Sequence, residues 1–227
     1  HGDAAGHVDE GIVLGETSAG AQGGQVIHVE IGGFRGIVIG GDFAAEGPVA
    51  LDAPDEAVPL VVEAGAGAKA WRAYLSVAPT FATQTAPAVP AVNARDRIGN
   101  GPWFNAKGQM IARDLAHLHN GNNISKETAL DEKGSVIKGR GDTPNEHDIL
   151  TGSRADGTAF APQQDTTCGA WTKSGEGSAI VGHHDRIGPL PENWAKSWNF
   201  SHPSVGCSQE ALIRTGGAGR FYCFAAN

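Results

Sequence analysis

The sequence has no cluster of basic residues and no long apolar run. Its 227 residues include 17 lysines and arginines against 25 aspartates and glutamates, a formal net charge of −8. DNA, RNA and heparin-like glycans are bound through clustered cations, so we expect no nucleic acid and no heparin as partners. No segment reaches the roughly 20 apolar residues that a membrane-spanning helix needs, so we expect no transmembrane segment.

Cysteine is scarce, and methionine does not begin the sequence. Cys168, Cys207 and Cys223 all lie in the last third and form no CxxC pair, which argues against a zinc knuckle or a thioredoxin-like site. One disulfide and one reduced thiol is the simplest interpretation in an oxidising compartment; three reduced thiols in a cytosolic protein is the alternative. A removed signal peptide would explain the start at His1, as would a trimmed or tagged chain, and we expect a secreted or periplasmic protein.

Glycine is abundant, and the chain has the size of one loop-rich globular domain. The small, polar residues 1–24 predict an N-terminal arm, followed by a domain over residues 25–227. Apolar and β-branched patterns predict strands at 25–31, 36–39, 60–62, 71–77, 149–152 and 219–224. Helix-start signals predict short helices at 114–119 and 125–130, and residues 139–145 have the composition of a turn.

Several short motifs follow one another over about 200 residues. They are QVIHV at 25–29, FRGI at 34–37, GDF at 41–43, WRAYLS at 71–76, PAVNARD at 90–96, PW at 102–103, TGSRADG at 151–157, TCGAW at 167–171, and Cys207 followed by FYCF at 221–224. In this order they resemble the motifs of endostatin, the C-terminal module of a collagen. The resemblance implies an α+β, C-type-lectin-like (endostatin-type) fold with twisted antiparallel strands, short helices and long loops.

The resemblance also implies a disulfide between Cys168 and Cys207. The family's remaining cysteine falls near Ala44 or Ala45, where this chain has none, which leaves Cys223 as a buried thiol. A hairpin pairing of Cys207 with Cys223 is the alternative that sequence spacing allows. The basic heparin-binding face of the family has no counterpart in this acidic chain.

A metal site is the sharpest chemical hypothesis that the resemblance implies. In endostatin a zinc ion is held by N-terminal histidines, a histidine of the first strand and an aspartate after the Val-Asn motif. His28 and Asp96 match the last two positions, and His1 and His7 supply the arm. Such a closed set suits structural Zn²⁺, while His1 alone could chelate copper; the plainer alternative is that His28 simply faces solvent.

A second polar cluster consists of His183, His184 and Asp185, with His202 downstream. Adjacent histidines on a strand point to opposite faces, so His183 and His184 can share one site only in a loop. A hydrolase built from Ser201 or Ser208 with His184 and Asp185 lacks a nucleophile elbow. We therefore favour structural hydrogen bonding for this cluster.

Calcium-dependent sugar binding of the C-type lectin kind is disfavoured. Asn145 lies in a Pro-Asn loop and Trp198-Asn199 matches part of the second motif, but Thr143 and Phe200 stand where acids are needed. Ligand binding without calcium is assigned to loop residues, namely Asn145, His183, His184, Asp185, Trp198, Asn199 and His202.

Together these observations predict a non-catalytic, extracytoplasmic protein that recognises a glycan or a cell-surface protein and carries a structural metal. Self-association into a homo-oligomer is compatible with this interpretation. The alternatives are a copper- or zinc-binding periplasmic metalloprotein that uses His1, and a hydrolase.

Overall fold

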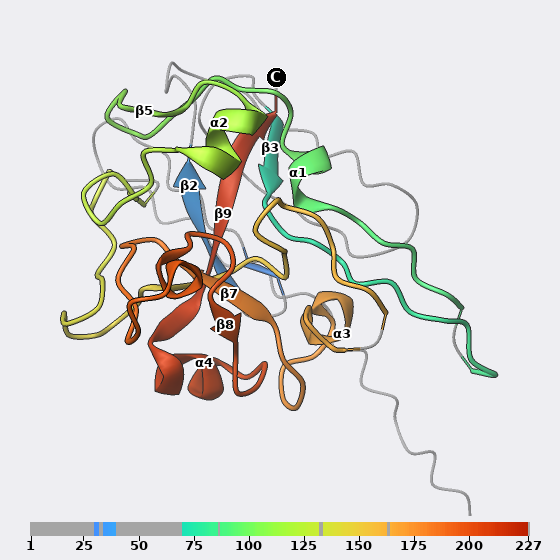
Figure 1. Ribbon diagram of the computed structural model, residues 1–227. Coiled ribbons are helices and arrows are strands. Elements are labelled where there is room, and N and C mark those ends of the chain that lie inside the picture. Colours follow the sequence, from blue (N-terminus) through green and yellow to red (C-terminus); the bar gives the residue numbers. More distant parts are fainter. Residues whose placement is uncertain are drawn as a thin grey trace, which may run out of the picture.

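The computed structural model describes residues 30–31, 34–39, 70–85, 87–131, 134–162 and 164–226 (Figure 1). The predicted arm and the strand expected at 60–62 lie outside these residues, as do the N-terminal half of the strand expected at 25–31 and the metal-site candidates His1, His7 and His28. Among the described residues, no helix is long and apolar enough to cross a membrane.

Most strands belong to one mixed seven-stranded sheet. Its order is β1-β2-β9-β6-β7-β8, and β3 also pairs with β9. The members are β1 (Glu30–Ile31), β2 (Phe34–Ile39), β3 (Ala70–Ala73), β6 (Asp148–Leu150), β7 (Ile180–His183), β8 (His202–Pro203) and β9 (Gly217–Ala226). A separate hairpin pairs β4 (Trp103–Phe104) with β5 (Met110–Ala112). The predicted α+β class is confirmed.

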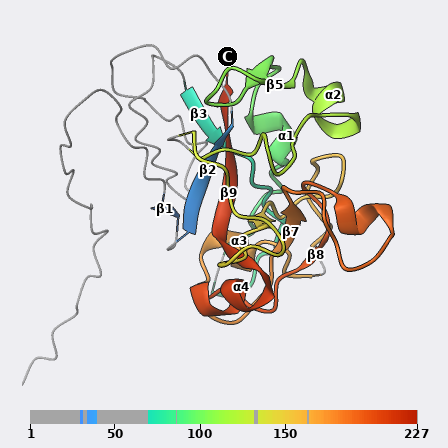
Figure 2. The same cartoon turned by 90° about the vertical axis from the view of Figure 1, so that its left-hand side faces the viewer.

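The expectation of antiparallel strands is confirmed only in part, because the sheet is mixed. The last strand, β9, runs parallel to both β2 and β6 and antiparallel to β3. Parallel pairs need long crossover connections, and the chain between β6 and β9 supplies one that also contains β7, β8 and three helices. Figure 2 shows β9 running through the middle of the molecule, with β2 and β3 beside it.

Alternation along β9 divides the core into two clusters. Phe221 and Cys223 face one cluster, which also contains Trp71, whereas Tyr222 and Phe224 face the other. Successive side chains of a strand point to opposite faces, and both faces of β9 are covered, so its side chains from 221 to 225 are all buried. The strand predicted at 219–224 is therefore confirmed as the centre of the core.

The helices are short, and α2 and α4 begin at a side-chain cap. They are α1 (Ala94–Arg97), α2 (Leu115–Asn120), α3 (Cys168–Trp171), the 3-10 helix η1 (Asn193–Lys196) and α4 (Gln209–Thr215). The helix expected at 114–119 is confirmed as α2, because the Asp114 carboxylate accepts a 2.7 Å hydrogen bond from the backbone N–H of His117.

The helix expected at 125–130 is wrong, because these residues form only a turn. The hydroxyl of Thr128 accepts from the backbone N–H of Ser125 and donates to the carbonyl oxygen of Asn123. Such side-chain bonds compete with helical ones. The turn expected at 139–145 is confirmed by a 3.1 Å bond from the N–H of Asp142 to the carbonyl oxygen of Gly139.

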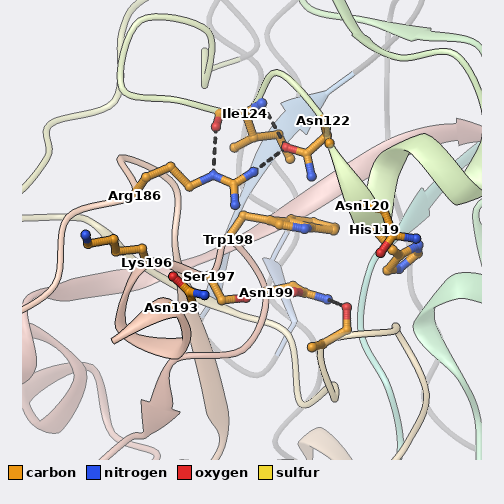
Figure 3. A pocket seen from close by; sticks show the side chains of 12 residues that line it. His119, Asn120, Asn122, Ile124, Arg186, Asn193, Lys196, Ser197, Trp198 and Asn199 are labelled. Carbon is orange, nitrogen blue, oxygen red and sulfur yellow. Dashed lines mark hydrogen bonds between the residues drawn. The ribbon is translucent and has the colours of Figure 1, made fainter. Parts of the chain in front are cut away.

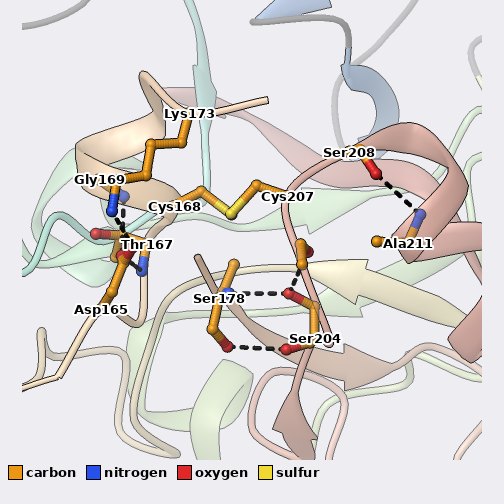
Figure 4. Close-up of a disulfide and its surroundings, with 12 residues drawn as sticks. Asp165, Thr167, Cys168, Gly169, Lys173, Ser178, Ser204, Cys207, Ser208 and Ala211 are labelled. Carbon is orange, nitrogen blue, oxygen red and sulfur yellow. Dashed lines mark hydrogen bonds and ion pairs between the residues drawn. A yellow bond between two sulfur atoms is a disulfide. The ribbon is translucent and has the colours of Figure 1, made fainter. Parts of the chain in front are cut away.

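One disulfide links α3 to the segment that precedes α4 (Figure 4). It joins Cys168 and Cys207 across a sequence separation of 39. The pairing implied by the family resemblance is confirmed, and the hairpin alternative with Cys223 is wrong. Cys223 is buried in β9 and takes no part in the bridge. A disulfide fits an oxidising, extracytoplasmic compartment.

Candidate metal centre

Three neighbouring strands bring four polar side chains together. Asp148 is the first residue of β6, directly after His147, and it pairs with His183, the last residue of β7. His202 begins β8 and lies opposite Val181 of β7. The lateral order β6-β7-β8 thus places a carboxylate and three imidazoles at one end of adjacent strands.

The imidazoles converge on a single oxygen atom. Oδ1 of Asp148 lies 3.1 Å from Nε2 of His147, 3.3 Å from Nε2 of His183 and 3.5 Å from Nε2 of His202. Nε2 of His183 lies 3.1 Å from Nε2 of His202. The rings of His147 and His183 are stacked, with centroids 4.2 Å apart. His147, Asp148 and His183 are buried, whereas the His202 side chain is 28% exposed.

The other ring nitrogens identify the protonation pattern. Nδ1 of His183 is 2.7 Å from the carbonyl oxygen of Ala195, and Nδ1 of His202 is 3.1 Å from that of Pro203. Nδ1 of His147 is 3.4 Å from Oδ1 of Asp185. These oxygens only accept hydrogen bonds, so each Nδ1 carries a hydrogen. In a neutral ring, Nε2 then carries a lone pair and no hydrogen. Metal-bound histidines are oriented in the same way.

Four electron-pair donors therefore face one another in a buried space. Neither carboxylate oxygen of Asp148 accepts a hydrogen bond, although both are buried. A buried carboxylate without such bonds is costly unless a cation compensates it. A tetrahedral ion with bonds of 2.0–2.1 Å separates its ligand atoms by about 3.3–3.5 Å. Four of the six ligand pairs, the three that involve Oδ1 of Asp148 and the pair His183–His202, are separated by 3.1 to 3.5 Å, close to these edges.

The electrostatics of the cluster favour an ionised Asp148. Burial raises the pKa of this carboxyl, but in a metal-free cluster hydrogens on Nε2 of His183 and His202 would bond to it, outweigh burial and lower the pKa overall. The same contact raises the pKa of His202, against the opposing effect of its burial. In the absence of a metal ion, His202 would bind a proton, and its positive charge would compensate the Asp148 carboxylate.

Asp185 and His184 lie next to this cluster with different roles. Asp185 orients His147 and also accepts from the backbone N–H groups of Arg140 and Ile187. These hydrogen bonds outweigh its burial and lower the pKa of the carboxyl. His184 points elsewhere, with Nε2 3.3 Å from the carbonyl oxygen of Lys138, and burial lowers its pKa to about 4.

The residues singled out from the sequence thus fall in separate places. His183 and His202 belong to the cluster, and the Asn145 side chain accepts a 3.3 Å bond from the backbone N–H of His147. Trp198 and Asn199 line a hollow described below. Asp96 is exposed on α1, 2.8 Å from the amide nitrogen of Asn93, and its predicted partners lie outside the described residues.

The serines considered for a hydrolase have other partners. The Ser201 hydroxyl donates to the carbonyl oxygen of Trp194 and lies 3.1 Å from Nδ1 of His183, while the Ser208 hydroxyl caps α4. Neither is hydrogen-bonded to His184. Since Nδ1 of His183 already donates to a carbonyl, it has no lone pair with which to activate Ser201.

His147 and Asp148 were not singled out from the sequence. Their only local signal is a polar His-Asp pair directly before the buried Ile149-Leu150 run of β6. The ligand-type atoms of His147, Asp148 and His183 all lie within 4.8 Å of one another, so this group of three could hold a metal ion. His202 joins it through its contacts with Asp148 and His183.

Comparisons with protein-family models, curated proteins and solved structures found no match to this chain. The fold and the site define a disulfide-bonded α+β domain with a buried histidine–aspartate cluster of metal-site character.

Proposed function

We propose that this protein is an extracytoplasmic binding protein stabilised by a transition-metal ion at His147, Asp148, His183 and His202. Three imidazole nitrogens and one carboxylate oxygen form a donor set that suits Zn²⁺ and is shared by Cu²⁺ and other borderline ions. The observation that carries the proposal is the convergence of three imidazole Nε2 atoms on Oδ1 of the buried Asp148, at 3.1–3.5 Å.

A structural role follows from the number and burial of the ligands. Four protein ligands complete a tetrahedral shell, whereas catalytic zinc sites keep one position open for water or substrate. His183 and His202 also flank residues 184–201, which connect β7 to β8. An ion bound to both histidines would fasten the two ends of this connection to β6.

The identity of the binding partner is also a proposal. An endostatin-like, C-type-lectin-like domain that recognises a glycan or a cell-surface protein is supported by the confirmed disulfide and by the long loops that carry Trp198 and Asn199. The alternative of copper bound by His1 concerns residues outside the described part of the chain.

Elemental analysis of the purified, full-length protein tests the metal proposal. We expect about one equivalent of zinc after incubation with Zn²⁺ and removal of excess. The variants Asp148→Asn and His183→Ala should retain less than about a tenth of an equivalent, with unchanged far-ultraviolet circular dichroism. His117→Ala is the matched control, because His117 is a half-buried histidine outside the cluster.

A variant of the predicted N-terminal site separates the two candidate centres. Zinc that persists in His28→Ala but is lost in His183→Ala is bound by the cluster. Wild-type protein that takes up no zinc, or zinc lost only in His28→Ala, would refute the proposed centre.

A further inference from the structure

A hollow of about 470 Å³ lies where the end of α2 approaches the connection between β7 and β8 (Figure 3). Its size falls within the usual range of small-molecule sites. Residues 119–122 contribute one wall, and Arg186 with Asn193 and residues 196–199 contributes the other. The buried Trp198 also lines the hollow.

The lining is cationic although the whole chain is acidic. Arg186 and Lys196 both line the hollow, and the lining contains no aspartate or glutamate. Neither cation has a carboxylate partner among the described residues. The nearest acid in sequence, Asp185, is engaged with His147 and the backbone of Arg140.

The guanidinium of Arg186 is fixed but only partly satisfied. Nε donates to the carbonyl oxygen of Ile124 at 2.9 Å, and one Nη2 hydrogen goes to Oδ1 of Asn122. A guanidinium has five N–H donors, so three remain without an acceptor in the described part of the chain. Burial lowers the pKa of Arg186, which means that its charge is partly desolvated. A planar, anchored guanidinium of this kind matches a carboxylate or phosphate group.

The remaining polar groups suit a hydroxyl-rich ligand. Asn199 is held rigidly, because its amide donates to the Tyr74 hydroxyl and to the carbonyl oxygen of Ala155. At the rim, the side chains of Asn120 and Asn193 make no hydrogen bonds among the described residues. The fixed Asn199 would lose little side-chain freedom on binding, and the unused amides of Asn120 and Asn193 can bond to hydroxyl groups.

We infer that this hollow binds an acidic sugar, with the carboxylate at Arg186 and Lys196 and the hydroxyls at Asn120 and Asn193. The inference rests on the proposed binding function and names its ligand class. Arg186 and Lys196 would select a negatively charged ligand. The amides of Asn120 and Asn193 would select a ligand with hydroxyl groups.

Calorimetric titration of the zinc-loaded protein with glucuronate, glucose and inorganic phosphate tests the inference. We expect saturable binding of glucuronate, about tenfold or more tighter than binding of glucose, which lacks the charge-assisted hydrogen bonds, or of phosphate, which lacks hydroxyls for the amides. Lys196→Gln should weaken glucuronate binding about fivefold or more, and Asn193→Ala should weaken it less. Lys107→Gln, an exposed lysine away from the hollow, should leave the affinity unchanged.

Several outcomes would overturn the inference. These are the absence of glucuronate binding, equal affinity for glucose, equal affinity for phosphate, or an affinity that Lys196→Gln leaves unchanged. Zinc content measured on the same samples keeps the two proposals apart. A zinc-free protein that binds glucuronate contradicts only the metal centre, and a zinc-loaded protein that ignores glucuronate contradicts only the acidic-sugar site.

Discussion

Chelation of the metal ion should lower the unfolding temperature of this protein by about ten degrees. An ion that binds only the folded chain stabilises it by about 4 kcal/mol when its free concentration is a thousand times the Kd. For a chain of 150–250 residues, 1 kcal/mol corresponds to about 2–4 °C, so the expected shift is about 8–16 °C.

The position of the ligands explains why the whole domain should respond. Asp148 begins β6, which pairs with the central strand β9, and His183 and His202 belong to the next two strands. Loss of the ion leaves the Asp148 carboxylate buried without a hydrogen bond. Protonation of His202, whose pKa this carboxylate raises, recovers part of the loss and moves the shift toward the lower end of the range.

Differential scanning calorimetry with zinc, with EDTA, and after zinc is restored measures this effect. In Asp148→Asn, which preserves the shape of the side chain, EDTA should have no effect, whereas His117→Ala should respond as the wild type does. A zinc-saturated wild type that melts within about 1 °C with and without EDTA would refute the argument. The argument would also be refuted if EDTA lowered the unfolding temperature of Asp148→Asn as much as that of the wild type.

Three further outcomes concern other parts of the molecule. Replacing both Cys168 and Cys207 by alanine should lower the free energy of unfolding in urea by about 4 kcal/mol, from the chain entropy of a loop of about 40 residues. Gly182→Ala should cost roughly 3 kcal/mol, because its Cβ would lie 1.9 Å from a backbone oxygen, while Gly175→Ala, with nothing within 4 Å, should change unfolding by less than about 0.5 kcal/mol. Burial raises the pKa of Asp165, but hydrogen bonds outweigh it and lower the pKa overall. Its contribution should therefore be present above pH about 4 and be lost at lower pH, so the stability difference from Asp165→Asn, measured by urea unfolding, should shrink from pH 6 to pH 3; a constant difference would contradict this.

The parts of the fold that sequence reasoning predicted are those with local signals. Alternating apolar residues predicted β9, and Asp114 at the start of an apolar segment predicted α2. The same type of signal failed at Ser125, where hydroxyl groups bond to the backbone and stop the helix after one turn. Parallel pairing of β9 with β2 and β6 depends on residues far apart in sequence, which no local pattern specifies.

The candidate metal centre was predicted only in part, for the same reason. His183 and His202 were noticed as polar residues, but nothing in the sequence links them to His147 and Asp148. Their proximity arises when β6 and β8 pair with opposite edges of β7. The sequence allowed His183 and His184 to share one site only in a loop. In the structure His183 ends β7, and the two rings have different partners.

The candidate metal centre and the hollow share one supporting segment. Nδ1 of His183 donates to the carbonyl oxygen of Ala195, and its backbone N–H donates to that of Ser197 at 2.8 Å. Asn193 and residues 196–199 line the hollow, so the peptide group of Ser197 belongs to the wall that would contact the sugar, and that of Ala195 lies between wall residues. If zinc makes this wall more rigid, it should strengthen glucuronate binding. By thermodynamic reciprocity, glucuronate should then strengthen zinc binding by the same factor.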